Sequence, residues 1–452
     1  MLQLNEASET VVYRLTLVLP DTFFVLARRS GTEAVLPRVG VPKVARAAEA
    51  IQKAIQAAWS TSAIILDFFT CLNGVPGCVA HLRTIRIPDG LIPVRLDRFS
   101  TPELTEQEKA AVSAISNADA DDRGCFSHVD WPGEAMQWIG KEAGHVIQFT
   151  GEIEQYNASG GFALARFPSQ NGPAYWLKAT GKPNLREFGI TAALAEICPQ
   201  YLPPILAMRR DWNAWVMEEF GRPMEHEVGI PVLQGVTKAL ARLQRETAGY
   251  TERLLVAGAA DHRPSRLRKH ADEVIANLDA AMARLNASGE PRISKDRLRE
   301  IGSILEDTCS AAEELSIPDT VIHNDLNRGN ILIRGNDCVF TDWCEAAIGN
   351  PFVTLQHLLL LLRREKNDPQ AATILESYKN CWLDLLPSSK IDKMFGLMPL
   401  LAVASHIYGQ GSHSQAFERN DCQELAYVCK LARYMDRAAK SVPLKETLCC
   451  RA

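Results

Sequence analysis

The sequence predicts an α+β protein in which a small α/β domain precedes a β-rich part and a large helical part. The chain has 452 residues, which is too many for one compact hydrophobic core. Alternating apolar runs typical of strands dominate residues 11–96 and 147–218, whereas apolar residues at helical spacing dominate residues 233–439. A polar stretch at 117–124 has the composition of a linker between the first two parts.

Residues 1–120 are expected to form the small α/β domain. Strand patterns cover 11–19, 22–27, 64–69, 78–87 and 91–96, and helix patterns cover 43–59 and 105–115. This order of elements resembles the Nudix fold. The helix over 43–59 contains Glu49 as its only acid, so the multi-glutamate box of Nudix enzymes is missing and we expect no pyrophosphatase activity.

Residues 130–220 are expected to form the β-rich domain, and residues 221–452 the helical one. The β-rich part has strand patterns over 147–157, 161–167, 175–179, 205–209 and 213–218, and helix patterns over 134–142 and 185–197. Its third strand carries Lys178 among apolar neighbours. The helical part has patterns over 233–247, 261–285, 296–315, 354–364, 369–385, 390–407 and 420–439.

Residues 321–343 contain the most informative pattern of the chain. His323, Asp325 and Asn330 lie in one short polar loop, and a β-hairpin follows because the apolar runs 331–333 and 338–340 flank a turn at 335–337. If the turn is centred on Asn336, Asn330 faces Asp342, and directly opposed residues have Cβ atoms about 5 Å apart.

An amide oxygen and a carboxylate held side by side suit Mg²⁺, which prefers hard oxygen ligands and takes its remaining ligands from water and phosphates. Asp325 beside them is free to orient an attacking hydroxyl, as phosphoryl transfer requires. The pattern therefore predicts Asn330 and Asp342 as metal ligands and Asp325 as the catalytic base. The alternative, that each residue satisfies backbone groups near a turn, explains one residue more easily than the full spacing.

At these residues the chain resembles the aminoglycoside phosphotransferase and choline kinase-like family. The matching stretches are His323-Asn324-Asp325-Leu326, Asn330-Ile331-Leu332, Asp342-Trp343 and Gly349-Asn350-Pro351. The resemblance implies a bilobal protein-kinase-like fold, with 130–220 as the small β-rich lobe and 221–452 as the large helical lobe. It also implies ATP as the phosphate donor, with GTP possible, and Mg²⁺ as the metal.

The resemblance assigns further residues to the nucleotide site. Lys178 is expected to contact the phosphates and to pair with a glutamate of the following helix, for which Glu187 is the first choice and Glu196 the alternative. A solvent-facing charge is the other interpretation of Lys178. The turn Ser159-Gly160-Gly161 is a candidate phosphate-covering turn, because glycines allow close backbone approach, although a plain hairpin turn explains it nearly as well.

Residues Glu218, Glu219 and Phe220 fall where the hinge between the two lobes is expected, and we expect them to line the adenine slot through backbone groups. For His323 we expect a structural role, hydrogen-bonding backbone near the metal loop. Asn350 stands where the family commonly has an aspartate that is structural, so little functional effect is expected there.

Composition narrows the classes of partner. The net charge is −5, so no basic surface dominates and nucleic acid is not an expected partner. No apolar run is long enough to span a bilayer, and the first residues lack the pattern of a signal peptide, so a cytoplasmic protein without membrane contact is expected. The twelve cysteines show no metal-binding spacing and are expected to be free thiols.

Two functions from different classes remain. The first is an ATP- and Mg²⁺-dependent O-phosphotransferase acting on a hydroxyl of a small molecule, such as an antibiotic-like compound, a sugar or an amino alcohol. The second is a catalytically weak or inactive nucleotide-binding pseudokinase that acts through a partner. The intact Lys178, Asp325, Asn330 and Asp342 favour the first. The acceptor and the oligomeric state stay open; Trp343, Trp382, Tyr408 and Phe417 could form an aromatic cage for an amino alcohol, but core packing is the commoner fate of such residues.

Overall fold

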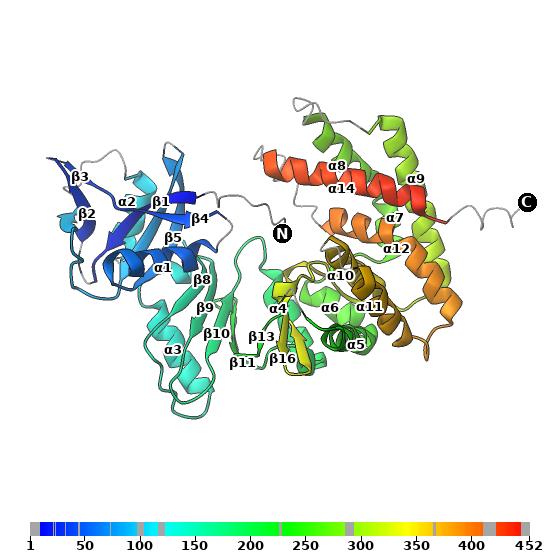
Figure 1. Cartoon of the computed structure of the whole chain (residues 1–452), viewed down its shortest axis with the longest axis horizontal. Helices are drawn as coiled ribbons and strands as arrows, with labels where there is room; N and C mark the ends of the chain where they lie inside the picture. The colour runs from blue at the N-terminus through cyan, green and yellow to red at the C-terminus, as the bar shows by residue number, and fades with distance from the viewer. Residues whose placement is uncertain are drawn as a thin grey trace, which may run out of the picture. The chain divides into compact units, whose positions relative to one another are not determined.

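The computed structural model describes residues 10–20, 22, 24–31, 33–43, 46–72, 74–96, 104–115, 123–225, 228–284, 293–364, 368–409 and 422–443. The chain divides into two compact units (Figure 1). Unit 1 comprises Met1–Phe188 and Pro204–Glu219, and unit 2 comprises Gly189–Pro203 and Phe220–Ala452. The main passage between the units therefore lies between Glu219 and Phe220, inside the segment expected to be the hinge. The division of the first 220 residues at 120–130 stays a prediction.

Unit 1 begins with a seven-stranded sheet in the order β3-β2-β1-β6-β5, with β4 beside β1 and β7 beside β2. β1 and β6 run parallel, and the other pairs are antiparallel. The strands are β1 (Thr10–Val18), β2 (Phe24–Ser30), β3 (Glu33–Val35), β4 (Arg38–Pro42), β5 (Ala63–Leu72), β6 (Val75–Leu82) and β7 (Ile92–Arg95); the helices are α1 (Ala47–Trp59), α2 (Glu106–Ile115) and α3 (Trp131–Glu142). β3 and β4 were not expected from the sequence.

The second sheet of unit 1 has five antiparallel strands in the order β11-β12-β10-β9-β8. These are β8 (Glu154–Ser159), β9 (Phe162–Phe167), β10 (Tyr175–Ala179), β11 (Ile205–Arg209) and β12 (Ala214–Glu218). Helix α4 (Arg186–Ile197) connects β10 to β11, so five strands with one helix after the third occur as the sequence predicts. α4 begins in unit 1 and ends in unit 2.

Period-2 alternation explains how the first sheet buries both faces. Leu17 of β1 belongs to the core that includes Ile51 and Ile55 of α1. The next residue, Val18, belongs to a second core that also contains Phe167 and other residues of the five-stranded sheet. The two sheets of unit 1 thus share one hydrophobic core, which also includes side chains of α2 and α3.

Unit 2 is mostly helical (Figure 1). It carries two small three-stranded sheets, β13-β16-β17 and β14-β18-β15. The strands are β13 (Arg222–Pro223), β14 (Ala260–Asp261), β15 (Thr320–His323), β16 (Ile331–Arg334), β17 (Asp337–Phe340) and β18 (Ala346–Gly349). The helices are α5 (Ile230–Thr247), α6 (Thr251–Ala257), α7 (Pro264–Lys269), α8 (Ala271–Arg284), α9 (Lys295–Leu315), α10 (Phe352–Arg364), α11 (Asp368–Asn380), α12 (Ser388–Gly409) and α14 (Cys422–Ser441).

The single helix expected over 261–285 is wrong. Residues 260–261 pair with β18, and the helical part breaks at His270, which has φ −112° and ψ 15°. The α+β class is confirmed, with a β-rich unit and a helical unit. None of the helices in the described part of the chain is long and apolar enough to cross a membrane.

Candidate active site

Asp325 lies in the loop that follows β15 in unit 2, and amide groups surround its carboxylate. The Nδ2 atom of Asn327 donates to both carboxylate oxygens at 3.1 Å. The Nδ2 atom of Asn330 donates to the main-chain oxygen of Asp325 at 2.8 Å and to Oδ2 at 3.3 Å. The bonds to the carboxylate oxygens fix the direction of this group. Because the acceptor is charged, they are stronger than hydrogen bonds between neutral groups.

Asn327 was not singled out from the sequence. Its Oδ1 atom accepts a hydrogen bond from the main-chain N–H of Gly329 at 2.8 Å and so caps the short 3-10 helix Arg328–Asn330. An asparagine at the start of a turn, two residues beyond the candidate base, is the signal that could have identified it, since asparagine side chains bond the backbone two residues on.

The predicted hairpin register is wrong by one residue. The turn has two residues, with Arg334 facing Asp337 and Ile331 facing Phe340, so Asn330 lies opposite Thr341 rather than Asp342. The physical reason is that Gly335 adopts φ +61° at the first central position of the turn, which a two-residue hairpin accepts. The face-to-face pairing of Asn330 and Asp342, on which the metal prediction was based, therefore does not exist.

The polar residues nevertheless gather at the open end of this hairpin. The main-chain N–H of Thr341 donates to the main-chain oxygen of Asn330 at 3.0 Å, which places Asn330 beside the residue that precedes Asp342. Asp342 has left the ladder and adopts φ +67° and ψ 64°. The carboxylate of Asp342 and the amide of Asn330 thus come from the two chain segments that meet at the end of β16 and β17.

Two neighbours of Asp325 hold the segment around Asp342. The Nε2 atom of His323 donates to the main-chain oxygen of Thr341 at 2.8 Å, which confirms the structural role expected for this histidine. The Nδ2 atom of Asn324 donates to the main-chain oxygen of Glu345 at 3.1 Å. The loop that carries the candidate base therefore contacts the chain on both sides of Asp342.

Asn324 also belongs to a buried polar network that sequence reasoning missed. Its Nδ2 atom lies 3.3 Å from Nδ1 of His262, which lies 2.8 Å from Oγ of Ser405 in α12. All three side chains are buried. Because these residues are far apart in sequence, no local pattern could reveal the network. Asn350 has the structural role expected for it, since its Oδ1 atom accepts from the main-chain N–H of Phe352 at the start of α10.

Lys178 and Glu187 form an ion pair within unit 1. The Nζ atom of Lys178 donates to Oε1 of Glu187 at 2.6 Å, and the side chains are 16% and 1% exposed. Glu196, the alternative partner, pairs instead with Arg253. The first turn of α4 thus provides the acid, and the solvent-facing interpretation of Lys178 is wrong.

Ser159, Gly160 and Gly161 form the turn between β8 and β9. The register places this turn at the same end of the sheet as Lys178, because Lys178 faces Leu164 and Ser159 faces Phe162. A contact between this turn and a nucleotide phosphate stays a prediction.

In the segment 218–220, the main-chain N–H groups of Glu218 and Glu219 already donate hydrogen bonds to other main-chain groups of unit 1. The N–H of Glu218 donates to the main-chain oxygen of Pro204, and that of Glu219 to the main-chain oxygen of Ala174, each at 2.9 Å. Arg166 donates to both carboxylate oxygens of Glu219, which lowers the pKa of Glu219 below its ordinary value. In unit 2, the guanidinium of Arg334 lies 4.2 Å from the ring centre of the buried Phe220.

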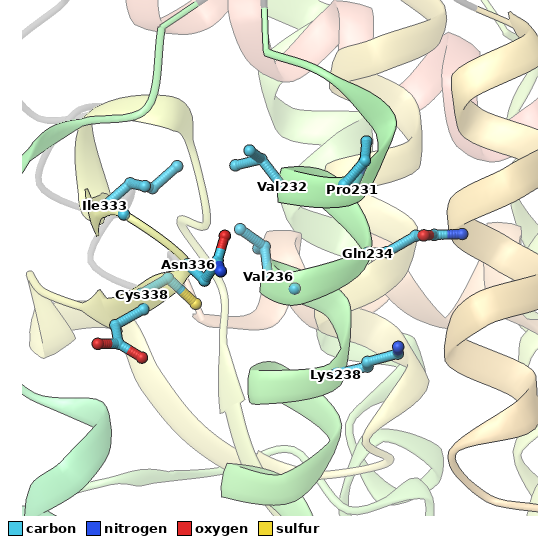
Figure 2. A pocket seen from close by; sticks show the side chains of 11 residues that line it. Pro231, Val232, Gln234, Val236, Lys238, Ile333, Asn336 and Cys338 are labelled. Carbon is cyan, nitrogen blue, oxygen red and sulfur yellow. The ribbon is translucent and has the colours of Figure 1, made fainter.

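A pocket of about 300 Å³ lies between α5 and the β16–β17 hairpin of unit 2. Figure 2 shows Val232 and Val236 of α5 on the side that faces the hairpin, while Gln234 and Lys238 extend from the helix in the other direction. Gln234 and Lys238 also line a groove of about 720 Å³ between α5 and α11. Neither hollow is lined by a residue predicted for the active site.

Three of the four aromatic residues proposed for an acceptor cage pack against other side chains of the protein. Trp343 and Trp382 are 2% and 1% exposed and belong to the core. Tyr408 packs edge-on against His262, with ring centres 5.3 Å apart. Phe417 lies outside the described residues.

Comparison with known proteins bears on the same part of the chain. Residues 232–387 match the model of a family described as the phosphotransferase enzyme family, APH. This segment contains Asp325, Asn330 and Asp342. No match is found among curated protein sequences.

Three small-molecule kinases are among the solved structures to which the chain is similar. A macrolide 2'-phosphotransferase from Brachybacterium faecium is 13% identical, with 66% of this chain and 97% of that chain covered and a TM-score of 0.44. A choline kinase from Cryptosporidium parvum Iowa II is 14% identical, with 70% and 96% covered and a TM-score of 0.45. An ethanolamine kinase from Plasmodium vivax is 14% identical, with 77% and 98% covered and a TM-score of 0.47.

The sequence match over residues 232–387, rather than these distant structures, supports the resemblance. Residues 232–387 carry the signature of the phosphotransferase enzyme family, which confirms the resemblance that the residues around Asp325 indicate.

Proposed function

We propose that the protein is an ATP- and Mg²⁺-dependent O-phosphotransferase that acts on a hydroxyl of a small molecule. The observation that carries this proposal is the carboxylate of Asp325, which the amides of Asn327 and Asn330 hold in place within the segment that matches the phosphotransferase model. In phosphoryl transfer the protein chiefly positions the reactants and neutralises the charge of the phosphates. One carboxylate accepts the proton of the attacking hydroxyl.

Asp325 takes the role of the base. Its two oxygens receive hydrogen bonds from neutral amides, so the carboxylate keeps a fixed direction, and no Lys or Arg among the described residues forms an ion pair with it. A hydroxyl within hydrogen-bond reach of this carboxylate would give up its proton as the oxygen attacks the terminal phosphate. Removal of the carboxylate leaves the amides in place but removes the proton acceptor.

Asn330 and Asp342 are the residues that would hold Mg²⁺. The donor set fits a hard divalent cation, because Asn330 uses its Nδ2 atom to contact Asp325 and its Oδ1 atom accepts no hydrogen bond from the described residues. When bound, Mg²⁺ neutralises phosphate charge. The hydrogen bonds from His323 and Asn324 to the main-chain oxygens of Thr341 and Glu345 hold the chain on both sides of Asp342.

Lys178 is the proposed contact to the nucleotide phosphates, and Glu187 orients it. Buried on α4, Glu187 restricts the ammonium group to one position, which lowers the entropy lost when a phosphate binds. The turn Ser159–Gly161 and the segment Glu218–Phe220 are proposed to contact the phosphates and the adenine. ATP is the proposed donor, with GTP as an alternative, and the acceptor is a small molecule in the cytoplasm rather than nucleic acid or a membrane component.

A transfer assay tests the proposal. The purified chain is given Mg²⁺, γ-labelled ATP or GTP, and a panel of aminoglycosides, macrolides, sugars and amino alcohols, and products are detected by a mass increase of one phosphate. Asp325→Asn should lower kcat by about 10²- to 10⁴-fold, the usual contribution of a general base, while the Kd for Mg·ATP changes little.

Asp337→Asn is the matched control, because Asp337 is an exposed acid in β17 of the same hairpin. This variant should retain wild-type turnover. Nucleotide binding without transfer to any acceptor, in wild type and Asp325→Asn alike, would refute the phosphotransferase and favour the pseudokinase. Equal turnover of Asp325→Asn and wild type would refute the role of Asp325.

A further inference from the structure

The N-terminal α/β part of unit 1 holds strand β8 through the side-chain amide of Gln155, which bonds both main-chain groups of Ile65 in β5. Gln155 is 1% exposed, and its Oε1 atom accepts from the main-chain N–H of Ile65 at 2.6 Å. Its Nε2 atom donates to the main-chain oxygen of the same residue at 2.9 Å. The main-chain N–H of Gln155 donates to Oε1 of Gln52 in α1 at 2.8 Å. β8 is therefore fixed to both β5 and α1, just before it enters the glycine turn.

The glycine turn itself is held by residues 123–127, which we call the clamp segment. The main-chain N–H of Phe126 donates to the main-chain oxygen of Gly160 at 3.1 Å. A Cβ atom on Gly160 would lie 1.8 Å from the main-chain oxygen of Arg123, and one on Gly124 would lie 2.2 Å from the main-chain oxygen of Gly160. The two backbones approach so closely that only glycine fits at either position.

The clamp segment is anchored in the shared core of unit 1. Phe126 is 2% exposed, and its ring centre lies 5.3 Å from that of Trp131 and 5.4 Å from that of Trp212, in edge-on arrangements. The turn also has a second close neighbour, since a Cβ atom on Gly181 would lie 2.9 Å from the main-chain oxygen of Gly161. The turn thus contacts both the clamp segment and the chain that follows the Lys178 strand.

We propose that the clamp segment is a positioning element that presets the glycine turn for nucleotide phosphates. This inference rests on the proposed function, since it assigns the turn to the nucleotide. It gives the described residues of the N-terminal α/β part a role: through the clamp segment they support a turn that each incoming nucleotide would otherwise have to order.

Preorganisation of the turn would strengthen nucleotide binding. A short glycine turn loses much conformational freedom when it closes on a ligand, because glycine is the least restricted residue. If only a fraction of molecules has the binding-competent turn, the observed Kd equals the intrinsic Kd divided by that fraction. The hydrogen bond from Phe126 and the close packing at Gly124 keep this fraction near one.

The test compares Gly124→Ala with Gly140→Ala in the full chain. Gly124 has φ +107° and no room for a methyl group against Gly160, so the variant must separate the clamp segment from the turn. Gly140 lies in α3 with nothing within 4 Å of an added Cβ atom, so its variant makes the same chemical change without that consequence. The Kd for Mg·ATP is measured by calorimetry, and hydrogen exchange is followed over residues 123–127 and 159–162.

If the proposal holds, hydrogen exchange of the turn is faster in Gly124→Ala than in wild type. The Kd of this variant for Mg·ATP rises about tenfold, which corresponds to a binding-competent fraction near one tenth. Gly140→Ala shows neither change. An unchanged Kd despite faster exchange would overturn the inference. A lower Kd would overturn it too, because it would mean that the clamp segment holds the turn away from the nucleotide.

If Gly124→Ala does not fold, the test is made on the wild type. Mg·ATP should slow hydrogen exchange in both the turn and the clamp segment, and protection of the turn alone would contradict the proposal. Failure of the wild type to bind Mg·ATP would refute the proposed function and this inference together, whereas normal wild-type binding with the outcomes above would refute only the clamp.

Discussion

The two glutamates of α4 offer a direct test of how unit 1 holds Lys178. Glu187 is 1% exposed and pairs with Lys178, which is 16% exposed, at 2.6 Å. Glu196 pairs with Arg253, and these side chains are 67% and 46% exposed. Glu187→Gln and Glu196→Gln therefore make the same chemical change on one helix, in a buried and in an exposed ion pair.

The expected magnitudes differ because solvent screens only the exposed pair. Loss of one partner from a buried pair costs about 3–5 kcal/mol, because the other charge is left without compensation. Lys178 keeps some exposure and the new amide can still accept a hydrogen bond, so we expect about 3 kcal/mol for Glu187→Gln, the lower end of that range. Glu196→Gln should cost below about 1 kcal/mol.

Urea unfolding followed by tryptophan fluorescence measures these differences, since Trp215 lies in unit 1 with its ring centre 5.7 Å from Nζ of Lys178. Glu187→Gln should also raise the Kd for Mg·ATP, whereas Glu196→Gln should not. The double variant Lys178→Met/Glu187→Gln should be more stable than Glu187→Gln alone, because it no longer buries an unpaired charge. Equal stability losses in the two single variants would refute the reasoning.

Three further predictions concern unit 2. Asn327→Ala should lower kcat about tenfold with little change in the KM for ATP, because it removes a donor worth about 1.5 kcal/mol in a hydrogen bond to a charged group; steady-state kinetics beside Asn327→Asp check this, and an unchanged kcat would contradict it. Gly335→Ala should reduce the free energy of unfolding by about 1 kcal/mol, since φ is +61° there with nothing near an added Cβ, while Gly335→Asn should cost less; equal midpoints of thermal unfolding would show that the turn differs from the one described. Burial raises the pKa of Asp319 to about 6, so this carboxyl is protonated more readily in the folded chain and its contribution to stability is lost as the pH rises through 6. Asp319→Asn should therefore stabilise the chain at pH 8 by at most about 3 kcal/mol and much less at pH 4, and a pH-independent effect in urea unfolding would argue against the raised pKa.

The sequence by itself determined the order of elements in the five-stranded sheet and the loop that carries the proposed base. Alternation predicted β8 to β12 with α4 after the third strand, because period-2 patterning is a property of neighbours along the chain. The spacing of His323, Asp325 and Asn330 within one loop was visible for the same reason. The family match over 232–387 agrees with that local signal.

The tertiary structure alone decided the register of the hairpin, the partner of Lys178 and the enclosure of the glycine turn. Gly335 and Asn336 can both adopt a positive φ, so the composition of the turn did not specify its centre, and a shift of one residue moved Asp342 out of the ladder. Glu187 and Glu196 lie on the same helix, and only packing buried the first of them beside Lys178. The hydrogen bond between Phe126 and Gly160 joins main-chain groups of segments that are distant in sequence. Because every residue has the same main-chain groups, the order of side chains could not predict it.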